Sequence, residues 1–160
     1  MKKGLIVLAS IVMIFAVAVY FFIFKEDYVQ HQVRVEQQIV SAVEKKRQTN
    51  ERALIDFTQI APFAWDNVYI FTPYTSSKMI SKQLGFKWNH KVVSTIETHD
   101  HIDLLVFVQN KEVTGYVEHA RSNGDFEIHN QMGFSRDEAI FEVVKGKDGE
   151  PDSFIIRNVR

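Results

Sequence analysis

The chain has 160 residues, a formal net charge of −1 and no cysteine. This length suffices for one domain and a membrane anchor. The lack of cysteine excludes disulfides, thiolate metal sites, a cysteine nucleophile and lipid attachment through cysteine. The nearly balanced charge argues against nucleic-acid binding, because no excess of basic residues is present to neutralise phosphates.

Residues 4–24 form an apolar run without a charged side chain. A helix rises about 1.5 Å per residue, so this run matches a hydrocarbon thickness of roughly 30 Å and predicts a transmembrane helix. Two lysines precede the run, whereas the one lysine directly after it, Lys25, is followed at once by two acidic residues. The positive-inside tendency therefore predicts a cytoplasmic N-terminus and an extracytoplasmic remainder.

A cleaved signal peptide is the alternative interpretation of the same run. The sequence Ala16-Val17-Ala18 fits the small-x-small cleavage pattern. Cleavage after Ala18 would leave the apolar residues 19–24 at a free N-terminus, which favours the uncleaved anchor. Under both interpretations the domain lies outside the cytoplasm, and the uncleaved anchor predicts a single-pass protein of the cell membrane.

A second helix is expected directly after the anchor. Residues 26–50 contain neither proline nor glycine, and the helix is expected to be continuous with the anchor and to extend to about Phe57. It carries four valines at helical spacing: Val29, Val33, Val40 and Val43. This stripe is too short and broken to predict a coiled coil. The helix is either a stalk or packs its valines on the domain, and packing is favoured.

The segment from residue 58 onward changes character. Pro62 breaks a helix because it has no amide hydrogen, and Val68–Phe71 is a short run typical of a strand. Ser76–Leu84 then has one apolar and one charged side, with serines suited to cap its start and Gly85 suited to end it. It predicts a short amphipathic helix.

The rest of the chain predicts strands joined by turns. Asn110-Lys111, Asn123-Gly124 and residues 146–151 are the expected turns. The expected strands are Val92–Thr98, Ile102–Val108, Glu112–His119, a strand through Phe126 and Ile128, Ala139–Val144 and Ser153–Val159. Of these, Ile102–Val108 is apolar enough to be central.

These elements together predict an α+β protein. An N-terminal transmembrane helix, extended by an amphipathic helix, would be followed by a mostly antiparallel sheet with one short helix. The expected divisions are an anchor at 1–25, a helical stalk or packing helix at 26–57 and an extracytoplasmic domain at 58–160.

Residues 62–74 stand out because they hold five aromatic residues and two prolines. Aromatic rings offer large contact area with little entropy to lose, so the segment could line a recognition groove through Trp65, Asp66, Tyr69 and Tyr74. The same residues could instead form a corner of the core, with Asp66 capping the turn before the strand. The core interpretation is favoured.

A resemblance rests on this segment. Its pattern W-D-x-V-Y-x-x-x-P-Y is formed by Trp65, Asp66, Val68, Tyr69, Pro73 and Tyr74, with Gly85 downstream. It resembles a segment of uncharacterised small bacterial proteins that are exported or membrane-anchored, and it covers about a quarter of the chain. The resemblance implies a bacterial origin and an exported setting, and it implies no activity and no residue role.

A second cluster combines imidazole and carboxylate groups. In an extended segment His99 and His101 would point to one face, with Glu97 and Asp103 beside them. Two imidazoles and a carboxylate suit zinc, although a structural site usually needs a fourth ligand, such as His119 or His129. The cluster could instead sense pH. A polar loop without a ligand is the favoured interpretation, so no metal or other cofactor is expected.

Catalytic patterns are absent from the sequence. It contains no G-x-S-x-G elbow, H-E-x-x-H helix, P-loop or dinucleotide fingerprint. The favoured function is a non-catalytic, membrane-anchored domain that binds a protein or envelope partner outside the cytoplasm. The alternatives are a small envelope enzyme with an unrecognised site, or a metal- or pH-responsive module that uses His99 and His101.

Overall fold

The computed structural model describes residues 2–129, 133–146 and 153–159, and within these ranges all side chains except those of residues 2–10, 20–30 and 94. The helices are α1 (Lys2–Thr49), α2 (Phe57–Ile60), α3 (Ser77–Leu84), α4 (Lys91–Thr98) and the 3₁₀ helix η1 (Arg121–Asn123). The strands are β1 (Ala53–Asp56), β2 (Asn67–Phe71), β3 (Ile102–Gln109), β4 (Glu112–Ala120), β5 (Asp125–Glu127), β6 (Gly133–Ser135), β7 (Ile140–Lys145) and β8 (Phe154–Asn158).

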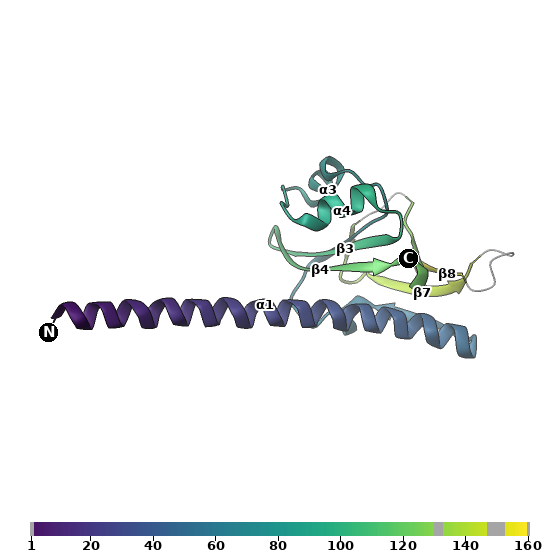
Figure 1. Cartoon of the computed structure of the whole chain (residues 1–160). Coiled ribbons are helices and arrows are strands. Elements are labelled where there is room, and N and C mark those ends of the chain that lie inside the picture. Colours follow the sequence, from purple (N-terminus) through teal and green to yellow (C-terminus); the bar gives the residue numbers. More distant parts are fainter. Residues whose placement is uncertain (1, 130–132, 147–152, 160) are drawn as a thin grey trace.

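The strands form two four-stranded sheets, which confirms the α+β class and the mostly antiparallel pairing. One sheet has the order β1-β7-β8-β5 and the other β4-β3-β2-β6. All pairs are antiparallel except β5 with β8, which run parallel. Helices α3 and α4 lie on one side of the second sheet, while the long α1 runs past the strands on another side (Figure 1).

The larger core fills the space between the two sheets and the second half of α1. Its aromatic centre is Phe57, which meets Phe107 of β3 and Phe141 of β7 edge to face, with both pairs of ring centroids 5.6 Å apart. Edge-to-face pairs bring the positive ring edge to the negative ring face. Alternate residues of each strand supply the remaining apolar side chains, as half-buried strands require.

Strand β3 is the central strand that its apolar sequence predicts. Leu105 and Phe107 belong to the core between the sheets, whereas Leu104, Val106 and Val108 belong to a second core beneath α3 and α4. Both faces of β3 are therefore covered, and this burial on two sides explains why its sequence does not alternate between apolar and polar residues.

The second half of α1 packs on the domain, as the favoured interpretation held, through Val43 of the predicted stripe and through two residues that were not predicted. Val35, Ile39 and Val43 are buried, whereas Val33 is 46% exposed. Of the predicted stripe, Val43 is therefore confirmed as buried and Val40 is partly buried, whereas Val33 was wrong and the side chain of Val29 lies outside the described residues. Positions 35, 39 and 43 recur every four residues, which places them on one helical face.

Helix α1 ends at Thr49, so the prediction that it continues to about Phe57 was wrong. Asn50 follows with a φ of 55°, a left-handed conformation that asparagine tolerates at a helix end. Residues 53–56 then pair with β7 as an edge strand. The buried positions Ala53, Ile55 and Phe57 alternate with more exposed ones, which is the period of a strand.

The predicted strand at Val92–Thr98 was also wrong, because this segment is the helix α4. The Nδ1 of His90 accepts a hydrogen bond from the amide of Val92 at 3.3 Å and caps the start of the helix. Val92, Val93 and Ile96 are buried on one helical face. The many β-branched residues favoured a strand, and the packing of this apolar face overrides that preference.

Several local predictions are confirmed. Ser76 caps α3 by accepting from the amide of Met79, and Gly85 ends it with a φ of 78°. Asn110 and Lys111 join β3 to β4 with φ values of 50° and 64°, as a primed two-residue turn requires. Of the predicted turn at residues 146–151, only Gly146 belongs to the described residues.

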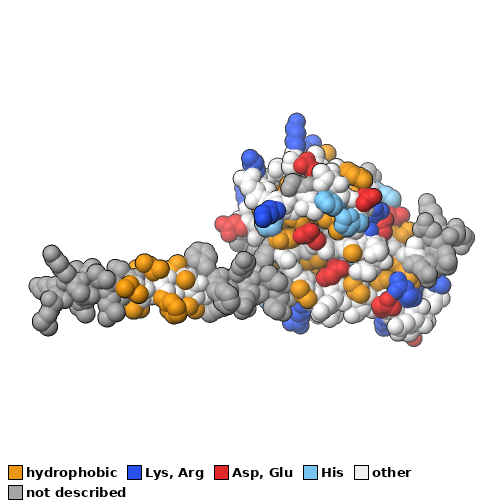
Figure 2. Space-filling view, viewed as in Figure 1, with side chains coloured by type: hydrophobic (Ala, Val, Ile, Leu, Met, Phe, Trp, Pro, Cys, Tyr) orange, Lys and Arg blue, Asp and Glu red, His pale blue; other side chains and the backbone are white. Residues whose placement is uncertain are grey.

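One end of α1 extends beyond the domain (Figure 1). Within the described part of the chain, no helix combines the length and the apolar character needed to cross a membrane. This gives no support to the anchor predicted at residues 4–24, although the side chains of residues 4–10 and 20–24 lie outside the described ones. Residues 11–19 of that segment are all exposed (Figure 2).

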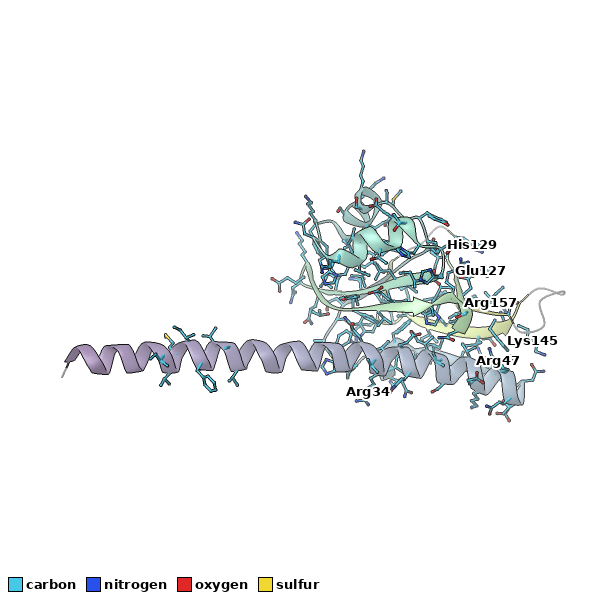
Figure 3. All side chains as sticks on the ribbon, in the orientation of Figure 1. Arg34, Arg47, Glu127, His129, Lys145 and Arg157 are labelled. Carbon is cyan, nitrogen blue, oxygen red and sulfur yellow. The ribbon has the colours of Figure 1, made fainter. Side chains whose placement is uncertain are left out.

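The opposite end of α1 is held by a contact with the first sheet. The guanidinium carbon of Arg47 lies 5.1 Å from the ring centroid of Phe154 in β8, and Figure 3 shows Arg47 on the side of α1 that faces the domain. A cation over an aromatic face is attracted by the ring quadrupole. Helix and sheet are thus joined at this end by both charge and burial.

Candidate functional site

Trp65, the first residue predicted for a binding surface, lies in the core between the sheets. Its side chain is 1% exposed and meets Phe107 edge to face, with ring centroids 5.6 Å apart. The guanidinium of Arg136 lies 4.6 Å from the indole centroid, and its Nη1 donates to the carbonyl of Trp65 at 3.1 Å. Because the indole is covered, it cannot form part of a surface groove.

The other three predicted binding residues have different surroundings. Asp66 Oδ2 accepts from the amide of Asn110 at 3.2 Å and so stabilises the turn between β3 and β4. Tyr69 is half-buried against the second core. Tyr74 is 65% exposed and has a φ of 62°. All three are at least partly exposed, so a role in binding stays a prediction for Asp66, Tyr69 and Tyr74.

The histidine cluster does not assemble as predicted, because residues 91–98 are helical. The rings of His99 and His101 lie 5.2 Å apart, but Glu97 accepts a hydrogen bond from the amide of Ser77 at 2.6 Å, and Asp103 is buried in β3. Among the residues that the structure describes, no group of three or more His, Asp or Glu side chains is placed to hold a metal ion.

An open groove lies beside α3 and α4 and has a volume of about 670 Å³. It is formed by α3, by the segment between the two helices and by α4. Its lining combines hydroxyl, amide, aromatic and charged groups: Ser77, Lys78, Ser81, Lys87, Trp88, Asn89, His90, Val93 and Glu97. Its volume is in the usual range for ligand sites. Of its residues only Glu97 had been considered for a ligand site, as a member of the histidine cluster, and none had been predicted for the aromatic binding surface.

Aromatic rings form one wall of this groove. Trp88 and His90 stack with ring centroids 5.3 Å apart and an interplanar angle of 14°. Tyr116 of β4 lies behind them, 5.5 Å from Trp88 and 4.8 Å from His90. Because His90 also caps α4, the position of this aromatic wall is fixed by the start of a helix as well as by the sheet.

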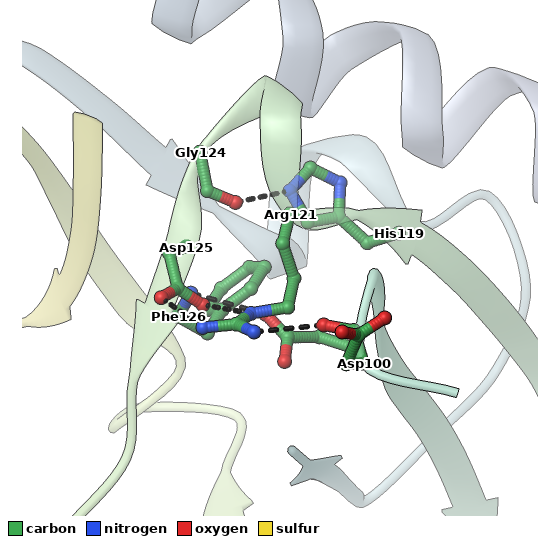
Figure 4. A network of polar contacts seen from close by, with 7 residues as sticks. Asp100, His119, Arg121, Gly124, Asp125 and Phe126 are labelled. Carbon is green, nitrogen blue, oxygen red and sulfur yellow. Dashed lines mark hydrogen bonds and ion pairs between the residues drawn. The ribbon is translucent and has the colours of Figure 1, made fainter. Parts of the chain in front are cut away.

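A second polar cluster is buried between α1, β4 and η1, and Figure 4 shows part of it. His119 is 0% exposed. Its Nδ1 lies 2.8 Å from Glu36 Oε2 on α1, and its Nε2 lies 2.7 Å from the carbonyl oxygen of Gly124. A carbonyl and a carboxylate both accept hydrogen bonds, so this geometry suits an imidazolium that donates from both nitrogens.

The electrostatics agree with this protonation of His119. Burial by itself lowers the pKa of a histidine. The hydrogen bond and the charge of Glu36, the carbonyl of Gly124 and the charge of Asp103 outweigh that effect and raise the pKa of His119 above its ordinary value of 6.5. The ion pair therefore joins α1 to β4 through a charge-assisted hydrogen bond.

Asp103 lies opposite His119 in the β3–β4 ladder and is also 0% exposed. Its Oδ2 accepts from the amide of Phe126 at 3.1 Å, whereas Oδ1 has no partner. Burial raises the pKa of Asp103 to about 7, against the opposing effect of the hydrogen bond from Phe126. This carboxyl therefore holds its proton up to near neutral pH.

Arg121 closes the cluster at its outer edge. Its Nε and Nη2 donate to the two carboxylate oxygens of Asp125 at 2.7 and 2.6 Å, and its Nη1 donates to the carbonyl of Asp100 at 2.8 Å (Figure 4). The cluster as a whole joins α1 to the sheet, and within it the pKa values of His119 and Asp103 are raised. Because His119 and Asp103 have no exposed surface, it has no room for a substrate, and the groove is the better candidate for a ligand site.

Comparison with known proteins adds no relative: no protein-family model, curated protein or solved structure matches the chain. The candidate site therefore rests on geometry.

The sequence does contain a signal for the groove. Residues 67–96 hold four lysines and neither an aspartate nor a glutamate, although the chain has 20 acidic residues. Within this stretch Lys87, Trp88, His90 and Lys91 lie almost next to one another. Basic residues that alternate with aromatic rings are typical of an anion-binding surface. This pattern was not interpreted as a binding site because residues 92–98 were expected to form a strand.

Proposed function

We propose that this protein is a non-catalytic domain, anchored in the cell membrane by residues 4–24, which binds a protein or envelope partner outside the cytoplasm. The observation that carries the proposal is the exposed apolar side of α1. Residues 11–19 are all exposed, and they include Met13, Ile14 and Phe15 at 70% exposure or more. A contiguous apolar surface of this kind is unfavourable in water and is typical of a segment covered by lipid.

The sequence around these residues extends the same argument. Residues 4–24 contain no charged side chain, and 21 helical residues span about 31 Å. Lysines at positions 2 and 3 lie before the segment, and acidic residues follow Lys25. This distribution favours a cytoplasmic N-terminus and an extracytoplasmic domain. The resemblance of residues 65–74 to exported bacterial proteins points the same way.

The groove beside α3 and α4 supports the binding function. It lies at the surface, and its charged and imidazole side chains are Lys78, Lys87, His90 and Glu97. Glu97 already accepts from the amide of Ser77, and His90 caps α4. Glu97 and His90 therefore stabilise the structure of the groove, which suits recognition of a ligand better than proton transfer during a reaction.

Site-specific photocrosslinking in cells tests this proposal. A photoreactive amino acid at Asn89, an exposed residue of the groove, is expected to capture an extracytoplasmic partner from the alkali-resistant membrane fraction. The same residue at Gln59, exposed on α2, is the matched control and is expected to capture nothing specific. Recovery of the protein in the soluble fraction, or equal capture from both positions, would contradict the proposal.

A further inference from the structure

The charge of the groove differs from the charge of the chain. Lys78, Lys82, Lys87 and Lys91 are all exposed on the segment that forms α3, the connection and the start of α4. The residues outside 67–96 hold 15 basic and 20 acidic side chains, so the remainder is acidic while this segment is basic. Figure 2 shows lysine side chains projecting from the part of the surface that α3 and α4 form. Such segregation attracts an anionic ligand.

We propose that the groove binds an anionic polymer of the cell envelope in which sugars or polyols are linked through phosphodiesters. The inference rests on the proposed function and names the partner for the same site. It follows from three features of the lining, which are the type of its cations, its aromatic wall and its neutral polar groups.

The cations that line the groove are Lys78 and Lys87, and no arginine lines it. Arginine pairs with carboxylates and phosphates alike through two parallel hydrogen bonds, whereas lysine binds phosphate as a compact point charge that needs no planar partner. A phosphodiester has one negative charge spread over the two non-bridging oxygens of a tetrahedral phosphorus and fits this chemistry. The carboxylate of Glu97 at the edge of the groove accepts from the amide of Ser77, so part of its charge is offset by that hydrogen bond.

The aromatic wall and the neutral groups suit the repeating unit of such a polymer. Trp88 is half-buried and lines the groove, and an indole offers a flat apolar face with little entropy to lose. The C–H face of a sugar ring packs on such a surface. Ser77, Ser81 and Asn89 also line the groove and supply hydroxyl and amide groups that can donate to, and accept from, the hydroxyls of a polyol.

The size and openness of the site favour a polymer over a small metabolite. The volume of about 670 Å³ accommodates more than one ring. The further cations Lys82 and Lys91 are exposed on the same segment, so a chain that leaves the groove would meet additional positive charge. A polymer that follows these cations should bind more tightly as it lengthens, because each added contact acts at high effective concentration.

Intrinsic fluorescence provides a direct test because the chain has only two tryptophans. Trp65 is buried in the core and Trp88 lines the groove, so a ligand of the groove is expected to change the emission of Trp88. The full-length protein in neutral phosphatidylcholine nanodiscs would be titrated with a synthetic oligo(glycerol phosphate) that carries N-acetylglucosamine. Trp88→Phe is expected to abolish the signal.

Charge variants and salt decide whether the lysines act as proposed. The double variant K78Q/K87Q is expected to weaken binding about tenfold, measured by calorimetry, while K45Q/K145Q removes two exposed lysines elsewhere and is expected to have no effect. Two lysine–phosphate contacts also predict that raising salt from about 50 to 200 mM weakens binding about sevenfold. Equal binding by both double variants would overturn the proposal.

Three competing probes test the chemical class. A neutral chitin oligomer has no phosphate, and hyaluronan carries carboxylates in its place. An oligothymidylate has phosphodiesters, but its sugars have no free hydroxyls within the chain for Ser77, Ser81 and Asn89. Each of the three is expected to bind at least tenfold more weakly than the oligo(glycerol phosphate). Equal binding of any of the three would overturn the assignment. If photocrosslinking from Asn89 captures a protein and the oligomer does not bind, the proposed function stands and this inference fails.

Discussion

His119 and Asp103 are two titratable residues without exposed surface, and they face each other across the β3–β4 ladder. Each has its pKa raised, although for different reasons. For Asp103 the cause is burial of a carboxyl with one unpartnered oxygen, and for His119 it is the charge-assisted bond to Glu36. The folded protein therefore holds protons at pH values at which the unfolded chain has released them.

The first prediction concerns stability against pH. Asp103 has a pKa near 3.8 when unfolded and about 7 when folded, so its contribution to stability is fully present at low pH and is lost as pH rises between these values, by about 4 kcal/mol at most. The raised pKa of His119 adds a loss in the same direction above pH 6.5. Urea unfolding across this range is expected to give a decreasing free energy of unfolding.

Asp103→Asn is the test of this assignment, because asparagine mimics the protonated acid. We expect the variant to lose most of the slope between pH 4 and pH 7, and to be more stable than the wild type at pH 8. Asp100→Asn, at an exposed carboxyl, is the control and should leave the slope unchanged. A slope that persists in Asp103→Asn would show that other groups carry it.

The second prediction concerns the ion pair between α1 and β4. Glu36→Gln removes the negative charge that His119 faces at 2.8 Å, so the pKa of His119 should fall. The lost charge-assisted bond should also cost about 2 kcal/mol of stability at pH 6. NMR titration of the His119 ring would measure the first effect. Glu44→Gln, at a more exposed acid on the same helix that pairs with Arg47, should leave the titration of His119 as it was.

At the scale of elements, caps and turns could be predicted from short sequence motifs, whereas other elements depend on tertiary packing. The cap at Ser76, the stop at Gly85 and the turn at Asn110-Lys111 could be predicted because each depends on one or two residues. The end of α1 and the helical state of residues 91–98 could not. Both depend on tertiary partners: β1 forms because β7 lies beside it, and α4 forms because its apolar face covers β3.

The third prediction tests whether the second half of α1 belongs to the domain. Ile39 is 0% exposed in the main core, so Ile39→Ala should lower the free energy of unfolding by about 2–5 kcal/mol through lost burial and a cavity. Val33 lies on the same helix and is 46% exposed, so Val33→Ala should stay within about 0.5 kcal/mol. Similar small effects of both changes would mean that α1 is a separate stalk.

At the scale of the whole molecule, the sequence analysis did not identify the candidate site, although residues 67–96 carry a charge pattern that belongs to it. The predicted binding residues came from the conspicuous segment 62–74, but the fold divides them between the core, a turn and the surface. The groove instead brings together α3 and the start of α4, with Tyr116 of β4 behind its aromatic wall. Only the packing of α4 on the sheet creates this proximity, and that element had been expected as a strand.

The fourth prediction separates anchoring from folding. Ile14→Lys places a charge within the exposed apolar residues 11–19, at a cost of about 3 kcal/mol if that position lies at the bilayer centre. We expect a marked loss of the protein from the membrane fraction, with the thermal unfolding of the domain unchanged. Val33→Lys, on the exposed side of the packed half of α1, is the control and should leave fractionation unaltered. Unchanged fractionation of Ile14→Lys would contradict the proposed anchor.

The continuity of α1 has a mechanical consequence. The helix runs from Lys2 to Thr49 as one element. Among its described side chains, His31 already contacts the domain, with its ring centroid 5.8 Å from that of Phe63. If the bilayer ends near residue 24, the six residues 25–30 before this contact add about 9 Å of helix. If the proposed anchor holds, this length of helix sets how far the groove stands from the lipid surface, and with it the distance from the membrane at which a partner can be bound.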